Sequence, residues 1–140
     1  MLKCADRSIT SNMEKVIMPA RDVEWLTAHN VRRQEYHVGY GKSYVPLKWS
    51  PQLAVQAKRW ANQLLGDCDI IEIKHKPGID EGENLSKNKG SGGMSKLYPA
   101  DKILNKWVER EMDDGYPDNA HLTQVCHADC FVRGMFIDIY

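Results

Sequence analysis

The segments HKPGIDEGENL, residues 75–85, and HLTQV, residues 121–125, decide the fold of this 140-residue chain. Together with a helical pattern between them, they contain two histidines and two glutamates, His75, Glu83, Glu111 and His121. Each of the four lies in a stiff local pattern, so folding could bring them together as a polar cluster. Two imidazoles and two carboxylates suit zinc or another divalent cation. They equally suit a metal-free network in which each histidine donates to a carboxylate.

The spacing of these residues does not settle the choice between a metal site and a network. The sequence contains no HExxH motif or other closely spaced ligand pair, so the metal prediction depends on the fold. Each residue also has a purely structural interpretation. His75 could be a solvated histidine at a strand end, Glu83 could cap a turn, and His121 could lie on the surface.

Composition places the chain among ordinary globular proteins. Its length fits one domain with a real core, and 42% hydrophobic and 27% charged residues are typical values. Nineteen basic and nineteen acidic residues cancel, so we expect no nucleic-acid partner and no general attraction to anionic membranes. No run approaches the roughly 18–20 apolar residues of a transmembrane segment, and residues 1–11 lack the apolar core of a secretory signal peptide.

The organisation along the chain predicts a poorly ordered arm at residues 1–20 and one domain at residues 21–140. A first helix is expected from Asp22, a good N-cap, to about His37. Asn30 and Arg33 lie in the middle of its inner stripe, where core residues would be expected. Because buried polar groups need partners, we expect both to tie this helix to a neighbouring loop.

Two further helices are predicted from apolar spacing and capping residues. The second begins after Ser50 and ends at Gly66, with Trp60 in its apolar stripe. The third runs from Pro99 to about Asp113, with Trp107 in its apolar stripe, and both tryptophans are expected to be buried. The sequence also predicts strands at residues 69–74 and 131–140. A glycine-containing loop is predicted at residues 86–98.

The third helix carries two candidate acids, and helical geometry favours one of them. At about 100° per residue, Glu111 falls near the middle of the apolar face that includes Trp107. A carboxylate centred on an apolar face is costly unless it is paired. We therefore expect Glu111 in the cleft and Glu109 on the surface.

The four cysteines allow several arrangements. Cys4, Cys68, Cys126 and Cys130 permit three full disulfide pairings, and one or two disulfides or free buried thiols are expected. Cys126 and Cys130, with His127 between them, are a weaker zinc candidate because no second ligand pair accompanies them.

Four ordered motifs resemble the CAP superfamily, which unites cysteine-rich secretory proteins, venom antigens and plant pathogenesis-related proteins. They are HNVRR at 29–33, LKW at 47–49 followed by Leu53, Ala57 and Trp60-Ala61, GENL at 82–85, and HLTQV at 121–125. The resemblance implies an α+β fold, a three-layer α-β-α sandwich with a central antiparallel sheet. It also implies a cleft that holds His75, Glu83, Glu111 and His121.

The chain departs from the family pattern at two places. The family usually places its helix glutamate three residues after the tryptophan, and that position here is Arg110. From residue 126 the sequence diverges, and at most one strand remains where two are expected, so the last strands of the sheet are expected to be incomplete.

The resemblance implies a secreted, extracellular binding protein with a defence or signalling role. Its cleft would hold a divalent cation, and its partners would be small apolar ligands such as sterols or fatty acids. An alternative is a zinc-dependent hydrolase or peptidase, with His75 and His121 on the metal and Glu83 or Glu111 as general base. A third possibility is a degenerate copy whose altered end prevents folding or binding.

Overall fold

A computed structural model describes residues 18–66, 73–80, 82–87, 98–126 and 135–139, the last of these by backbone alone. The elements in chain order are α1 (Ala20–Gly39), α2 (Pro51–Leu65), β1 (Glu83–Lys87), α3 (Ala100–Trp107), the 3-10 turn η2 (Glu109–Glu111), α4 (Ala120–Cys126) and β2 (Met135–Ile139). The fold is therefore mixed helix and strand, as the sequence predicts. In the described part of the chain, no helix is long and apolar enough to cross a membrane.

The strands form a parallel pair, with Glu83 opposite Met135 and Lys87 opposite Ile139. This corrects the expected antiparallel arrangement, at least for the strands that the structure describes. The reason lies in the connection between them. Antiparallel neighbours can be joined by a tight turn, whereas parallel strands need a long crossover, and here the connection contains α3, η2 and α4.

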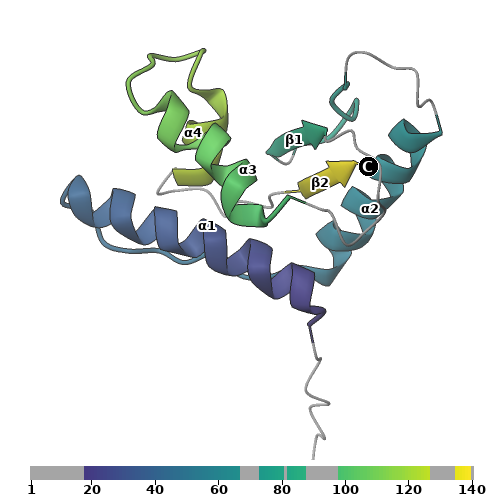
Figure 1. Ribbon diagram of the computed structural model, residues 1–140, viewed down its shortest axis with the longest axis horizontal. Helices are drawn as coiled ribbons and strands as arrows, with labels where there is room; N and C mark the ends of the chain where they lie inside the picture. The colour runs from purple at the N-terminus through teal and green to yellow at the C-terminus, as the bar shows by residue number, and fades with distance from the viewer. Residues whose placement is uncertain (1–17, 67–72, 81, 88–97, 127–134, 140) are drawn as a thin grey trace, which may run out of the picture.

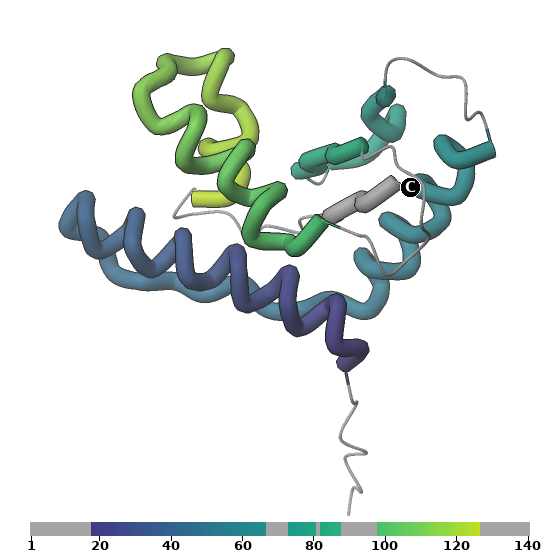
Figure 2. The backbone as a smooth tube through the Cα atoms, viewed as in Figure 1, coloured from purple at the N-terminus to yellow at the C-terminus, as the bar shows by residue number. Residues whose placement is uncertain are grey.

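Helices lie on both sides of this strand pair. Helix α2 contacts β2, and α4 contacts β1, while α1 packs along α3 and α4 (Figure 1). From the end of α1, residues 40–50 run back along that helix to the start of α2 (Figure 2). Helix α4, which carries His121, therefore lies between α1 and β1.

The start of α2 agrees with the predicted capping residue, whereas the start of α1 and the end of α3 differ from the prediction. Ser50 caps α2 as expected, because its hydroxyl oxygen accepts from the backbone N–H of Leu53 at 3.3 Å. Helix α1 begins at Ala20 after Pro19, so Asp22 lies in its first turn and is not its N-cap. Helix α3 ends at Trp107, well before the expected Asp113, and the tighter turn η2 follows.

Of the remaining predicted segments, some lie outside the described residues. These are the arm at 1–17, most of the strand predicted at 69–74, most of the loop predicted at 86–98, and residues 131–134 of the last predicted strand. Ile73 and Lys74 lie in no strand, and Ser86 and Lys87 belong to β1.

Two apolar clusters form the core. The larger lies between α1, α3 and α4 and includes Trp25, Leu104 and Trp107. The smaller joins α2 to β1 through Ala57, Leu64 and Leu85. Trp107 is buried as predicted. Trp60 lies on the inner side of α2 as predicted, but it is only partly buried.

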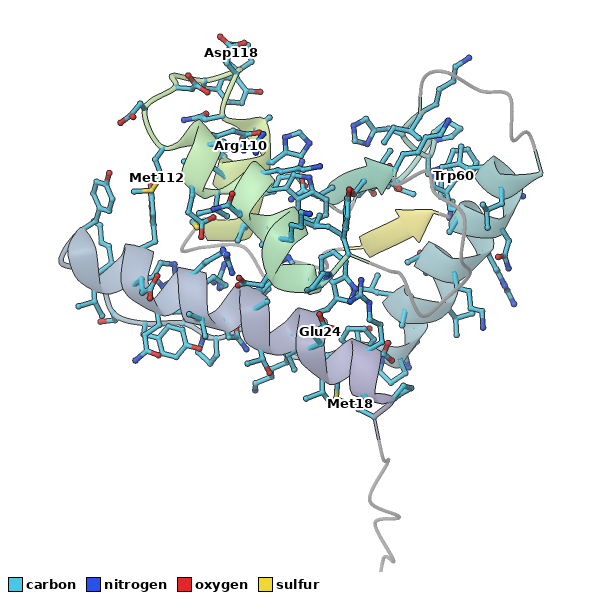
Figure 3. The ribbon with its side chains drawn as sticks, in the orientation of Figure 1. Met18, Glu24, Trp60, Arg110, Met112 and Asp118 are labelled. Carbon is cyan, nitrogen blue, oxygen red and sulfur yellow. The ribbon has the colours of Figure 1, made fainter. Side chains whose placement is uncertain are left out.

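Trp60 is only partly buried, on the side of α2 that faces the strands (Figure 3). It packs against the edge of the smaller cluster, and its indole nitrogen donates to the carbonyl of Lys74 at 3.1 Å. A tryptophan with a polar N–H commonly keeps that end near the surface, where an acceptor is within reach.

The polar stripe of α1 holds the fold together, with Arg33 at its centre. The Arg33 side chain is fully buried and donates to the carbonyl of Val45 from Nε and Nη2, at 3.0 and 2.8 Å. Its Nη1 donates to the carbonyl of Val125 in α4 at 2.8 Å. One guanidinium therefore joins α1, the returning segment 40–50 and the end of α4.

Neighbouring polar side chains extend this connection. The Asn30 amide donates to the carbonyl of Leu47 at 3.2 Å and accepts from the N–H of the same residue at 2.7 Å. His37 Nε2 donates to the carbonyl of Cys126 at 2.9 Å, and its Nδ1 accepts from the N–H of Val45 at 3.2 Å. The prediction that Asn30 and Arg33 tie the first helix to a neighbouring loop is confirmed.

Replacing Arg33 by alanine should lower the free energy of unfolding by at least about 2 kcal/mol, since each buried acceptor left unpaired costs about 1–3 kcal/mol. Denaturant unfolding would measure the loss. Arg59→Ala on the exposed face of α2 is the matched control and should stay within about 0.5 kcal/mol of wild type. Equal losses for the two variants would contradict the central place given to Arg33.

Candidate functional site

The structure joins the four candidate residues into two histidine–glutamate pairs. Nδ1 of His75, in the loop before β1, lies 2.8 Å from Oε1 of Glu83, the first residue of β1. Nδ1 of His121, near the start of α4, lies 2.7 Å from Oε1 of Glu111, the last residue of η2. The members of each pair are therefore supplied by consecutive elements of the chain.

Each carboxylate also binds the backbone N–H of the residue after its histidine. Oε1 of Glu83 accepts from the N–H of Lys76 at 3.0 Å, and Oε2 of Glu111 accepts from the N–H of Leu122 at 3.1 Å. Leu122 lies in the first turn of α4, where backbone N–H groups have no partner within the helix and favour negative charge. Both glutamates therefore fix the ring and the backbone of a histidine segment at once.

In each pair the glutamate side chain is less exposed to solvent than the histidine side chain. The side chains of Glu83 and Glu111 are 3% and 14% exposed, whereas those of His75 and His121 are 67% and 39% exposed. A carboxylate shielded from water needs hydrogen-bond partners. The histidine and the following amide supply them at Oε1 of Glu83 and at both oxygens of Glu111, whereas Oε2 of Glu83 is buried without a partner. The imidazoles remain open to solvent.

The hydrogen bonds also fix which ring nitrogen is free to bind a ligand. A carboxylate is an acceptor, so in the neutral imidazole Nδ1 carries the hydrogen and Nε2 carries the lone pair. In both pairs the nitrogen with a free lone pair is therefore Nε2, the atom turned away from the glutamate.

An aromatic contact adds a further restraint on His121. Its ring is stacked on that of Trp107, with parallel planes and centroids 5.9 Å apart. Trp107 is stacked in turn on Trp25 in the core, at 5.8 Å. The hydrogen bond to Glu111 and the stacking contact together define both the direction and the plane of this imidazole.

The break after α3 explains which acid reaches the site. The carboxylate of Glu111 reaches His121 from a 3-10 turn, not from the continuous helix on which the sequence argument placed it. Arg110, at the family's usual glutamate position, is exposed on the neighbouring part of the turn (Figure 3). Glu109 does not simply face solvent, because it pairs with Arg32 of α1 at 2.8 Å.

The described residues contain no ready-made cluster of three or more metal-binding side chains (histidine, cysteine, aspartate or glutamate). The divalent cation therefore stays a prediction. His127 and Cys130 of the weaker zinc candidate lie outside the described residues, as do Cys4 and Cys68.

Cys126 is a buried free thiol, and burial raises its pKa to about 12. It is therefore protonated and unreactive at neutral pH. Of the two expected alternatives, a disulfide or a free buried thiol, Cys126 shows the second.

Sequence reasoning missed the residues that join the two halves of the site. Asn84 follows Glu83 in β1, and its Nδ2 lies 3.4 Å from the carbonyl of His121. Gly82 allows α4 to approach, because a Cβ there would lie 3.0 Å from Oε1 of Gln124. The GENL and HLTQV segments contain all of these residues, but only contact between the segments reveals their roles.

His29 lies behind the site in the core, 6.4 Å from Trp107 between ring centroids. Its Nδ1 donates to the carbonyl of Trp25 at 2.8 Å, and the side chain is fully buried. Burial, and to a smaller extent the charges of Arg32 and Arg33, lowers the pKa of His29 from 6.5 to about 3. The folded protein therefore keeps this imidazole neutral.

Comparison with known proteins agrees with the motifs. The family described as "Cysteine-rich secretory protein family" matches residues 26–136. The chain is 35% identical over 108 residues to pathogenesis-related protein 1 of Arabidopsis thaliana, a match that covers 73% of this chain and 57% of that protein. It is 32% identical over 104 residues to pathogenesis-related protein 1A of Nicotiana tabacum, covering 74% and 53%. The chain thus spans about half the length of these relatives, and no solved structure matches it significantly.

Stability should fall with acid because of His29. Between pH 6.5 and 3 the unfolded chain binds a proton that the folded chain does not, so the free energy of unfolding falls as pH falls, by up to about 1.4 kcal/mol per pH unit. Urea unfolding from pH 7 to pH 4.5 would measure this slope. His29→Gln removes the titrating group and should show a shallower decline. Parallel pH profiles for the two proteins would contradict the assignment.

Proposed function

This chain belongs to the cysteine-rich secretory protein family, and from that premise we propose that it is an extracellular, defence-related protein whose two histidine–glutamate pairs bind a divalent cation. The defence role and the extracellular location are proposed from the family and from the pathogenesis-related relatives. We propose with them the family's complete three-layer sandwich. The cation site is proposed from the side chains of the chain itself.

The observation that carries the cation proposal is the repeated hydrogen bond from a histidine Nδ1 to a glutamate, buried in the case of Glu83 and partly buried in the case of Glu111. Histidines that bind metals usually donate their other ring N–H to a carboxylate or carbonyl, which fixes the tautomer and makes the ligand more basic. The same arrangement occurs at His75 and at His121. We therefore assign His75 and His121 as the ligands, through Nε2, and Glu83 and Glu111 as the residues that orient them.

The donor set fits zinc better than calcium or magnesium. Imidazole nitrogen suits zinc, copper and nickel, whereas calcium and magnesium require oxygen ligands. Two protein ligands would leave positions on the ion for water or for an oxygen of a bound molecule, so the ion would act as a Lewis acid that holds a polar group. In the proposal, each carboxylate accepts the Nδ1 hydrogen of its histidine and leaves Nε2 as the nitrogen that binds the ion.

The small apolar ligands expected from the resemblance, a sterol or a fatty acid, remain part of the proposal. The support is that the family relation holds over most of the chain. The contacts within the described residues do not define where such a ligand would lie.

Zinc titrated into the protein at neutral pH should bind through the histidines. In isothermal calorimetry, His75→Ala with His121→Ala should abolish binding, whereas Glu83→Gln or Glu111→Gln should weaken it about 10–100-fold, the usual effect of removing an orienting partner. Binding should also weaken with acid, because imidazole must be unprotonated to bind the metal.

The buried His29 provides the matched control, because His29→Gln removes a histidine outside the two pairs and should leave zinc affinity unchanged. Equal zinc affinity in wild type and in the double histidine variant would place any bound metal elsewhere and overturn the proposal.

A further inference from the structure

Asn84 occupies a position that the two pairs leave unexplained. It follows Glu83 in β1, and its backbone is fixed opposite Phe136 in the parallel pair. Glu83 holds His75, while the Asn84 side chain reaches across to α4, where Nδ2 lies 3.4 Å from the carbonyl of His121. Two successive residues of one strand therefore contact the two histidine segments.

The other end of the same amide is unsatisfied. Asn84 is 3% exposed, and its Oδ1 is buried without a hydrogen-bond partner. A buried acceptor without a donor lowers the stability of the fold, and an apolar side chain of similar size would avoid that cost. Packing alone therefore does not account for an asparagine here.

Asn30 shows what a purely structural amide looks like in this protein. Its Oδ1 accepts from the N–H of Leu47 and its Nδ2 donates to the carbonyl of Leu47, so both ends are satisfied. It lies on α1, between that helix and the segment 40–50, and has no contact with either histidine pair among its hydrogen bonds. Asn30 is thus a matched reference for Asn84.

We propose that Asn84 is a positioning residue that sets His121 relative to His75 and thereby tunes cation affinity without touching the cation. This inference rests on the proposed cation-binding function. The Asn84 side chain connects the backbone of His121 to the strand that carries Glu83. The positions of both histidine segments then depend on contacts to successive residues of one strand.

The test is the variant Asn84→Leu, which keeps the approximate size of the side chain and removes both amide ends. Zinc affinity measured by calorimetry should fall at least about 10-fold. The midpoint of thermal unfolding without zinc should stay the same or rise, because the unpaired Oδ1 is gone. The matched variant Asn30→Leu should do the reverse, with a lower unfolding midpoint and wild-type zinc affinity in the folded protein.

A zinc-free measurement separates failure of this inference from failure of the proposed function. The imidazole signals of His121 in NMR spectra should shift in Asn84→Leu and not in Asn30→Leu. Wild-type zinc affinity in Asn84→Leu would overturn the positioning role, whatever the unfolding midpoint of the variant. Absence of zinc binding by wild type would overturn the proposed function, and the His121 signals would then decide the positioning claim alone.

Discussion

The buried guanidinium of Arg33 is the constraint on which the rest of this structure depends. It reaches the carbonyl of Val45 in the returning segment and the carbonyl of Val125 in α4. A guanidinium can donate several hydrogen bonds in fixed directions, so one side chain at the middle of α1 sets the position of both partners. His121 lies near the other end of α4, and its distance from α1 is therefore fixed by the same contact. Without Arg33, α4 would keep the contact of His37 with the carbonyl of Cys126 but would lose its link to the returning segment through the guanidinium.

Two unrelated segments reach the same local solution around their histidines. In one, a strand supplies the glutamate, and in the other a 3-10 turn supplies it. In both, the carboxylate binds Nδ1 of the ring and the next backbone N–H. Glu83 is buried, Glu111 is partly buried, and the imidazoles are more exposed to solvent, so the acids determine the geometry and the histidines are available for chemistry. Trp107 links this arrangement to the core by stacking on His121.

Sequence reasoning found the parts of the fold that depend on local chemistry. Ser50 and the apolar spacing after it were sufficient to place α2, because a cap and a stripe are local properties. The unexpected polar stripe of α1 correctly indicated that Asn30 and Arg33 bind other segments. The end of α3 at Trp107 could not be predicted in the same way, because a competing hydrogen bond between Glu111 and α4 accompanies the tighter turn. The parallel direction of the strands depends on the crossover between them, and the partial exposure of Trp60 depends on the acceptor at Lys74. Both are tertiary properties that no local pattern encodes.

Glu83 and Glu111 hold His75 and His121 with hydrogen on Nδ1 and a free lone pair on Nε2 in the neutral rings. Long-range proton–nitrogen NMR of the imidazole rings tests it most directly, because protonated and unprotonated ring nitrogens have well-separated chemical shifts. In the neutral rings of both histidines, Nδ1 should be protonated and Nε2 unprotonated, and the signal of Nε2 alone should move strongly when zinc is added. Rings with hydrogen on Nε2, or a zinc-dependent change at Nδ1, would contradict it.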